Sequence, residues 1–162
     1  MTFRILPALL LLSACTTPGP REPSGPVLPF GTYPQGAEDF CKAYLAELQS
    51  SNDEGTAGRI YDLTDPTIAE RLTRPSVLTR VNPDYPSNAL QNGQDGDVVL
   101  AGIIERGGRV SNVKVLIPER VRGFDAAALE SFRQWTFQPA RIDGRFSRSY
   151  YCTTIRFRLE DA

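Results

Sequence analysis

The sequence predicts an α+β fold, a β-β-α-β unit with a three-stranded antiparallel sheet and a crossover helix. Two runs rich in β-branched residues, 97–105 and 109–117, are joined by a short glycine-containing segment, which is typical of a hairpin. Apolar residues then recur at helical spacing over 124–135. A third run, 146–159, alternates near its end between apolar and arginine side chains, as a strand does.

The order of these elements restricts the topology. The hairpin makes the second strand antiparallel to the first, and the helix carries the chain back for a right-handed crossover. The third strand should therefore lie beside the first, which gives a sheet ordered second, first, third. Both outer strands are expected to keep one free edge. Gln138-Pro139 is expected to end the helical pattern, because proline cannot continue a helix.

The apolar side chains also predict what is buried. Phe124, Phe132, Trp135 and Phe137 lie on one helical face or at its exit, so we expect them in the core rather than at a binding site. The run 97–105 is apolar on both of its sides. Such a strand is expected to be buried on both faces of the sheet.

The composition argues against an enzyme and against a nucleic-acid partner. The chain has 18 basic and 19 acidic residues, three cysteines and no histidine. Histidine-based catalysis and histidine metal sites are therefore excluded, and three cysteines are too few for a four-cysteine zinc site. Acidic residues such as Asp95 and Asp97 fit a solvated turn, and neither Lys42 nor Lys114 lies in an S-x-x-K pattern. We expect no catalytic residue, no metal and no cofactor.

The N-terminus is predicted to be a targeting segment rather than part of the fold. Residues 1–14 contain an arginine and a short apolar run, and Leu12-Ser13-Ala14-Cys15 resembles a bacterial lipobox, which predicts a lipid on Cys15. The alternative is ordinary secretory cleavage after Ala14, although Leu12 is too large for an A-x-A pattern. Residues 15–36, rich in proline and glycine, are expected to form an extended linker.

Residues 37–74 are expected to form an N-terminal helical segment ahead of a domain at 75–162. Over 37–50, one helical face is expected to carry Phe40, Cys41, Tyr44, Leu45 and Leu48. Asp65-Pro66 is a fitting N-cap and first-turn pair for a short helix through about Leu72. A further helical turn is expected over 87–90.

The second half of the chain resembles the TonB C-terminal domain family. The motifs that carry the resemblance lie in family order and are Pro83-x-Tyr85-Pro86, Gly96-x-Val98, Gly108-Arg109-Val110-x-Asn112-Val113, Phe124-Asp125-x-Ala127-Ala128-Leu129, Trp135-x-Phe137-x-Pro139-Ala140 and Ile155-Arg156-Phe157. The resemblance covers roughly residues 75–160 and implies a β-β-α-β fold. It also implies binding of a short segment of an outer-membrane transporter by strand addition. Family members of the usual type carry an N-terminal transmembrane helix, whereas here a cleavable signal is expected.

Candidate partner-binding residues lie in two places. The resemblance places the entry of the sheet near the family's contact surface, and the strand order leaves the last strand, from Tyr150 to Phe157, at the sheet edge for an added strand. The candidates are Tyr85, Pro86, Arg148, Tyr150, Thr154, Arg156 and Arg158. For Tyr85-Pro86 the alternative is a structural role in stiffening the entry to the sheet. For the three arginines the alternative is a solvated edge that resists aggregation.

Two classes of function follow. The first is a peptide-binding lipoprotein on the periplasmic face of the envelope, held by its lipid at the outer membrane, whose last strand accepts a segment of another protein. The second is a structural or assembly lipoprotein that keeps the fold but closes this edge with its own N-terminal segment or as a homodimer.

Cys41 and Cys152 are predicted to form a disulfide. A lipid on Cys15 would leave these two cysteines as an even pair in an oxidising compartment. Cys152 alternates with Tyr151 and Thr153, so it should point away from the crossover helix. The bond would then hold the N-terminal helix against the other face of the sheet. Two unrelated buried thiols are the alternative.

Overall fold

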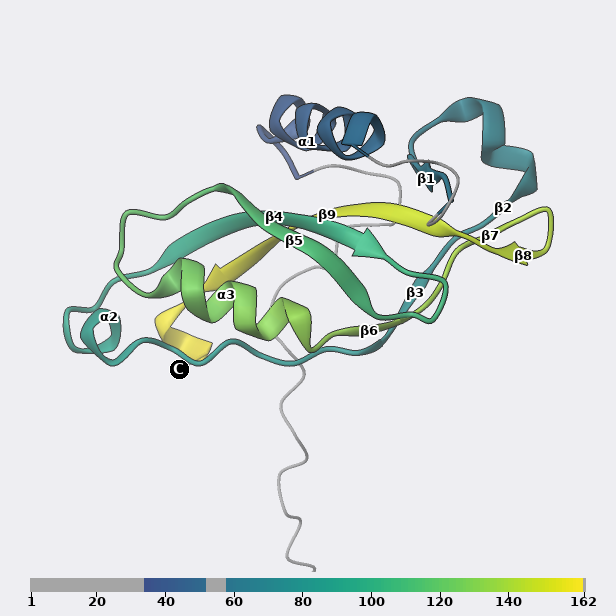
Figure 1. The fold of residues 1–162 in the computed structure, drawn as a ribbon. Helices are drawn as coiled ribbons and strands as arrows, with labels where there is room; N and C mark the ends of the chain where they lie inside the picture. Colours follow the sequence, from purple (N-terminus) through teal and green to yellow (C-terminus); the bar gives the residue numbers. More distant parts are fainter. Residues whose placement is uncertain (1–33, 52–57, 162) are drawn as a thin grey trace, which may run out of the picture.

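The computed structural model of the protein describes residues 34–51 and 58–161 (Figure 1). The predicted signal peptide, Cys15 and nearly all of the linker lie outside the described residues. The element order and the layers below refer to the described part of the chain.

The predicted β-β-α-β unit is present. Strands β4 (Gly96–Ile104) and β5 (Val110–Ile117) form the antiparallel hairpin, and helix α3 (Phe124–Arg133) follows. Strand β9 (Arg148–Phe157) returns beside β4 and pairs with it continuously from Gly96↔Phe157 to Ile104↔Ser149. The predicted order of second, first and third strand is therefore confirmed.

The hairpin turn depends on Gly108. Its φ of 80° lies in the left-handed region, which glycine adopts without steric cost. The Gly108 amide donates to Glu105 O (2.8 Å), and Gly108 O accepts from the Phe137 amide (2.8 Å). A Cβ at this position would collide with the Phe137 carbonyl oxygen. The turn thus also fixes the segment that follows α3.

The predicted end of the crossover helix is wrong. α3 ends at Arg133, and strand β6 (Thr136–Gln138) pairs antiparallel with β3 (Ser76–Thr79) before Pro139 is reached. Trp135 and Phe137 are both buried, and two side chains spaced two residues apart share one face only in an extended segment. The tertiary core therefore overrides the helical spacing.

The expected free edge on β9 is only partly free. Strand β1 (Ile60–Tyr61) pairs parallel with β9 at Arg148 and Ser149, so the four-stranded sheet has the order β1-β9-β4-β5. The sequence run 60–61 is too short for its pairing to be predicted. β5 is the opposite edge strand of this sheet.

The central sheet is buried on both faces, as the first strand predicted. α3 covers one face, where it packs with Val98, Leu100 and Ile104 of β4. Helix α1 (Glu38–Ser51) covers the other face (Figure 1), with Val99, Ala101 and Ile103 of β4 beneath it. The predicted aromatic core of Phe124, Phe132, Trp135 and Phe137 is buried beside α3.

The remaining elements border this core. The Asp65 carboxylate caps η1 (Pro66–Arg71), a 3-10 helix, by accepting from the Thr67 amide (2.8 Å). β2 (Leu72–Thr73), β7 (Arg141–Ile142) and β8 (Arg145–Phe146) form a small antiparallel sheet. The helical turn expected over 87–90 is α2 (Ser87–Gln91), and η2 (Leu159–Asp161) closes the described chain.

Candidate functional site

Helix α1 is fastened to the sheet by a disulfide between Cys41 and Cys152, with 6.1 Å between their Cα atoms. Both cysteines are buried, and Tyr150 beside Cys152 meets Tyr44 of α1 edge-on at 6.3 Å between ring centroids. The Tyr44 hydroxyl donates to Asn112 O on β5 (2.8 Å). The structure therefore contains the predicted pair, and it places α1 across β9, β4 and β5.

One residue of the predicted α1 face is wrong. Phe40 is 54% exposed, whereas Cys41, Tyr44, Leu45 and Leu48 are buried as expected. Phe40 precedes Cys41 by one residue, which turns its side chain about 100° around the helix axis and out of the buried stripe.

The candidate binding surface is the backbone of β9 from Tyr150 to Phe157, on the side facing away from β4; we call it the open edge. β1 ends beside Ser149, and among residues 34–51 and 58–161 no other strand pairs with β9. Every second amide and carbonyl along such an edge points outward and can bond to an incoming chain. The arrangement supports backbone recognition of an extended peptide rather than a chemical reaction.

Two of the predicted partner-binding residues, Thr154 and Arg156, lie on accessible parts of the open edge. Thr154 is half-buried and Arg156 is exposed. They pair across the sheet with Val99 and Asp97, so their backbone positions are set by the β4 ladder. This pairing holds the edge extended before any partner arrives.

Three further candidates lie at the end of β9 where the strand finishes. The Tyr85 ring meets Phe157 edge-on at 5.8 Å between centroids, and its hydroxyl donates to Gln94 O (2.6 Å). Pro86 begins α2. Arg158 forms an ion pair with Asp97 (2.7 Å) and donates to Gly96 O (3.1 Å). These contacts tie the entry of β4 to the end of β9, in agreement with a structural role for Tyr85.

Arg148 fits neither of its two expected roles, a partner-binding residue or part of a solvated edge. Its side chain is 7% exposed, and its guanidinium bonds to both carboxylate oxygens of Glu105 at 2.9 and 3.1 Å. A third bond, to Gly58 O (2.9 Å), links it to the start of β1. β1 covers this end of β9. The positive charge of Arg148, expected to face water, is therefore neutralised by Glu105 within the fold.

The Tyr150 side chain is also not available to a partner. It is 3% exposed because α1 covers it, a helix whose position the strand pattern does not reveal. The next residue, Tyr151, faces the α3 core, where burial raises the pKa of its phenol. Only the backbone of these two residues can contribute to binding at the open edge.

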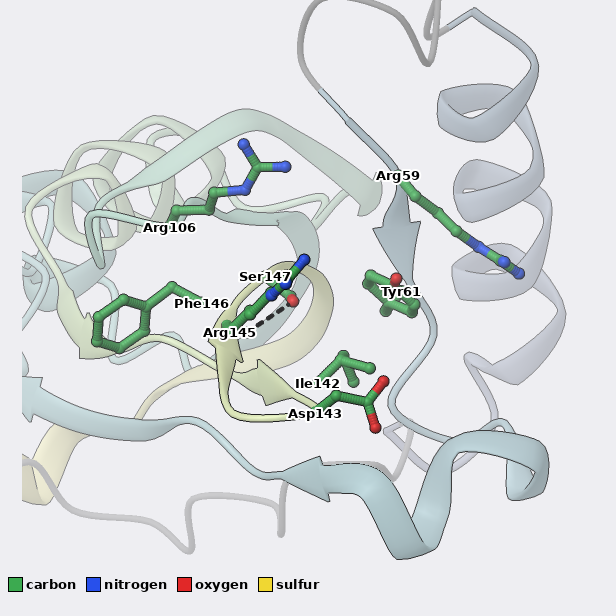
Figure 2. A pocket seen from close by; sticks show the side chains of 8 residues that line it. All are labelled: Arg59, Tyr61, Arg106, Ile142, Asp143, Arg145, Phe146 and Ser147. Carbon is green, nitrogen blue, oxygen red and sulfur yellow. Dashed lines mark hydrogen bonds between the residues drawn. The ribbon is translucent and has the colours of Figure 1, made fainter.

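A second surface, which the sequence analysis did not identify, lies beside β1 (Figure 2). It is a groove of about 650 Å³ between β1, the β4–β5 turn and the β7–β8 hairpin. Arg59, Arg106 and Arg145 line it together with Tyr61. These arginines are far apart in the sequence and follow no motif, so only the fold brings them together.

A metal site is not part of this arrangement. In the part of the chain that the structure describes, no three cysteine or acidic side chains come close enough to hold a metal ion.

Comparison with known proteins identifies the half of the chain that carries the open edge. Residues 81–159 match the family model for the Gram-negative bacterial TonB protein C-terminal. This part of the chain is a TonB C-terminal domain. It contains β4, β5, α3 and β9, whereas α1 and β1 precede it.

The TonB C-terminal domain is similar to curated TonB proteins. Protein TonB of Xanthomonas campestris pv. campestris is 31% identical over 77 residues, which are 48% of this chain and 34% of that protein. Protein TonB of Yersinia enterocolitica is 30% identical over 87 residues, which are 54% of this chain and 32% of that protein. The matches thus span about a third of the length of these relatives.

Among solved structures, the TonB2 protein of Vibrio anguillarum is 32% identical to the matched part, with 50% of this chain and 77% of that chain covered and a TM-score of 0.41. Within residues 34–51 and 58–161, no helix is both long and apolar enough to span a membrane.

Proposed function

We propose that this chain is a lipoprotein of the bacterial envelope whose TonB C-terminal domain binds an extended segment of another envelope protein. The segment adds as a strand along the open edge, from Tyr150 to Phe157. The lipid on Cys15 and the linker that follows it hold the domain near the periplasmic face of the outer membrane. A terminal segment of an outer-membrane transporter is the expected partner, by analogy with the TonB proteins that the domain resembles.

The observation that carries the proposal is the pairing of β9, which bonds to β4 on one side and, from Tyr150 to Phe157, to no described strand on the other. The β4–β9 ladder runs without a register shift along its whole length. Because β9 is already extended, binding orders only the incoming peptide, and the entropic cost of binding is correspondingly small. Backbone bonds supply affinity, and alternate side chains near Thr154 and Arg156 supply specificity.

A second candidate is a structural lipoprotein that binds no transporter, in which the open edge is covered by the chain's own N-terminal segment or by a second copy of the chain. The pairing of β1 with Arg148 and Ser149 favours it, because part of the edge is already covered by the chain's own N-terminal segment. A homodimer joined through two open edges would complete the closure.

Proline substitutions along β9 test the proposal. Consecutive amides of a strand point to opposite sides, so one of Thr153 and Thr154 donates toward β4 and the other outward. Of T153P and T154P, one variant should lose a backbone hydrogen bond between β4 and β9 and should have a lower free energy of unfolding. The other should lose only the amide that points outward from the open edge. T153A and T154A keep both amides and serve as matched controls.

The readout is a photo-crosslinking residue at Arg156 in intact cells, with urea unfolding of each purified full chain. We expect the proline variant that keeps wild-type stability to lose its crosslink to an extended segment of another envelope protein, while both alanine variants keep it. Crosslinks to that partner in both folded proline variants would overturn the open-edge proposal. Crosslinks only to a second copy of the chain would establish the structural candidate instead.

A further inference from the structure

The groove beside β1 is rich in positive charge that the described residues do not neutralise. Arg59, Arg106 and Arg145 are all exposed and come from three separate elements: the residue preceding β1, the β4–β5 turn and β8. Across residues 34–51 and 58–161, the ion pairs found involve other cations, at Arg71, Lys114, Arg148 and Arg158.

One carboxylate, that of Asp143, lines the groove, and it forms an ion pair with an arginine outside the groove. Asp143 pairs with Arg71 at 3.1 Å, on the side of η1. It therefore compensates the groove only in part. Three guanidinium groups around one partly used carboxylate leave a surface that favours an anion.

The three arginine side chains extend from different sides of the groove (Figure 2). Arg145 reaches from the hairpin toward β1, facing Tyr61, and Arg106 extends from the β4–β5 turn. Arg59 lies over the Tyr61 ring, 5.3 Å from its centroid, and runs toward α1. Arg106, whose guanidinium lies against Gly58, and Arg145 are thus the two arginines of the groove that no ring contact engages within the described part of the chain.

The size and lining of the groove indicate more than a simple anion. About 650 Å³ is within the range of sites that hold drug-sized ligands and is much larger than one phosphate needs. Ile142, which is buried, and Tyr61 add apolar surface to the charged rim. The guanidinium fork matches a carboxylate with two parallel hydrogen bonds.

We propose that this groove binds an acidic segment of a partner protein, with a glutamate or aspartate carboxylate between Arg106 and Arg145 and an apolar side chain against Tyr61. The site lies beside β1, past the end of the open edge, and is built from residues 59–61, the β4–β5 turn and the β7–β8 hairpin. It is separate from the proposed strand addition and does not depend on it.

The test uses the full chain, purified in a neutral detergent, and two labelled peptides. One alternates glutamate with valine and the other replaces each glutamate by glutamine. Fluorescence anisotropy measures binding at low and high salt. We expect the glutamate peptide to bind at least about tenfold more tightly than the glutamine peptide, with affinity that falls as salt rises, since screening weakens exposed charges.

Two double variants with the same loss of charge locate the site. R106Q/R145Q should weaken binding of the glutamate peptide about tenfold or more. R120Q/R122Q, which alters exposed arginines between β5 and α3, should change it less than about twofold. Whichever of T153P and T154P keeps wild-type stability should leave it unchanged, which separates this site from the open edge.

Equal losses in the two double variants would show a general charge effect and overturn the proposal. So would equal affinities for the glutamate and glutamine peptides. The proposal would also be overturned if inorganic phosphate displaced the labelled glutamate peptide as effectively as unlabelled glutamate peptide does. The groove would then bind any anion and would not recognise a peptide.

Discussion

At the scale of single residues, Arg148 shows how position changes the role of a charge. Arg156 on the same strand is exposed, whereas Arg148 bonds to Glu105 and to Gly58 O at low exposure. Removing one partner of such a pair leaves the other charge poorly solvated, which costs far more than an exposed charge does. The pair also links β9 to β4 and to the start of β1.

We expect R148L to lower the free energy of unfolding by ~2–4 kcal/mol, less than for a fully buried pair because Glu105 keeps partial contact with water. Urea unfolding of the purified full chain measures this change. R156L, the same substitution eight positions along β9, is the matched control and should cost under ~0.5 kcal/mol. Equal costs in the two variants would contradict the role assigned to the Arg148 ion pair.

At the scale of elements, α1 depends on one covalent bond and a modest apolar face. Its buried residues are Cys41, Tyr44, Leu45 and Leu48. Cys41 precedes the family-matched domain and Cys152 lies within it, 111 positions further along the chain. The disulfide therefore closes a long loop, and a long loop loses the most entropy in the unfolded chain.

We expect C41S/C152S to lower the free energy of unfolding by up to ~4–5 kcal/mol in the chain-entropy model. Amide exchange should accelerate in α1 more than in β4, because β4 keeps its ladders to β5 and β9. Thiol titration of denatured, unreduced protein from the periplasm should find neither thiol free. Two free thiols, or unchanged exchange in α1, would show that the bond does not hold the helix.

At the scale of the whole molecule, the chain combines a predicted lipid anchor, a TonB C-terminal domain and an N-terminal addition. The addition supplies α1 and β1, which cover one face of the sheet and one end of its edge. The linker from Thr16 to Gly36 spans at most ~75 Å when fully extended, at up to ~3.6 Å per residue. The domain is therefore expected to act close to the membrane that holds the anchor.

We expect Cys15 to carry lipid. Cells grown with a labelled fatty acid should incorporate it into the wild-type chain and not into C15S, and the wild-type chain should fractionate with outer membranes. Since Cys15 lies outside the disulfide, C15S should keep the unfolding curve of the oxidised domain. A soluble, unlabelled wild-type chain in the periplasm would contradict the anchor and with it the placement in the proposed function.

The sequence by itself determined the β-β-α-β unit, its strand order and the two-faced burial of β4, because these follow from local periodicity and short connections. It also predicted the Cys41–Cys152 pair from the cysteine count, and the face of the sheet on which Cys152 lies from alternation along β9. Only the tertiary structure decided the end of α3, the pairing of β1 and the burial of Arg148 and Tyr150. These features depend on contacts between distant segments, which override local preference and leave no periodic signal in the chain.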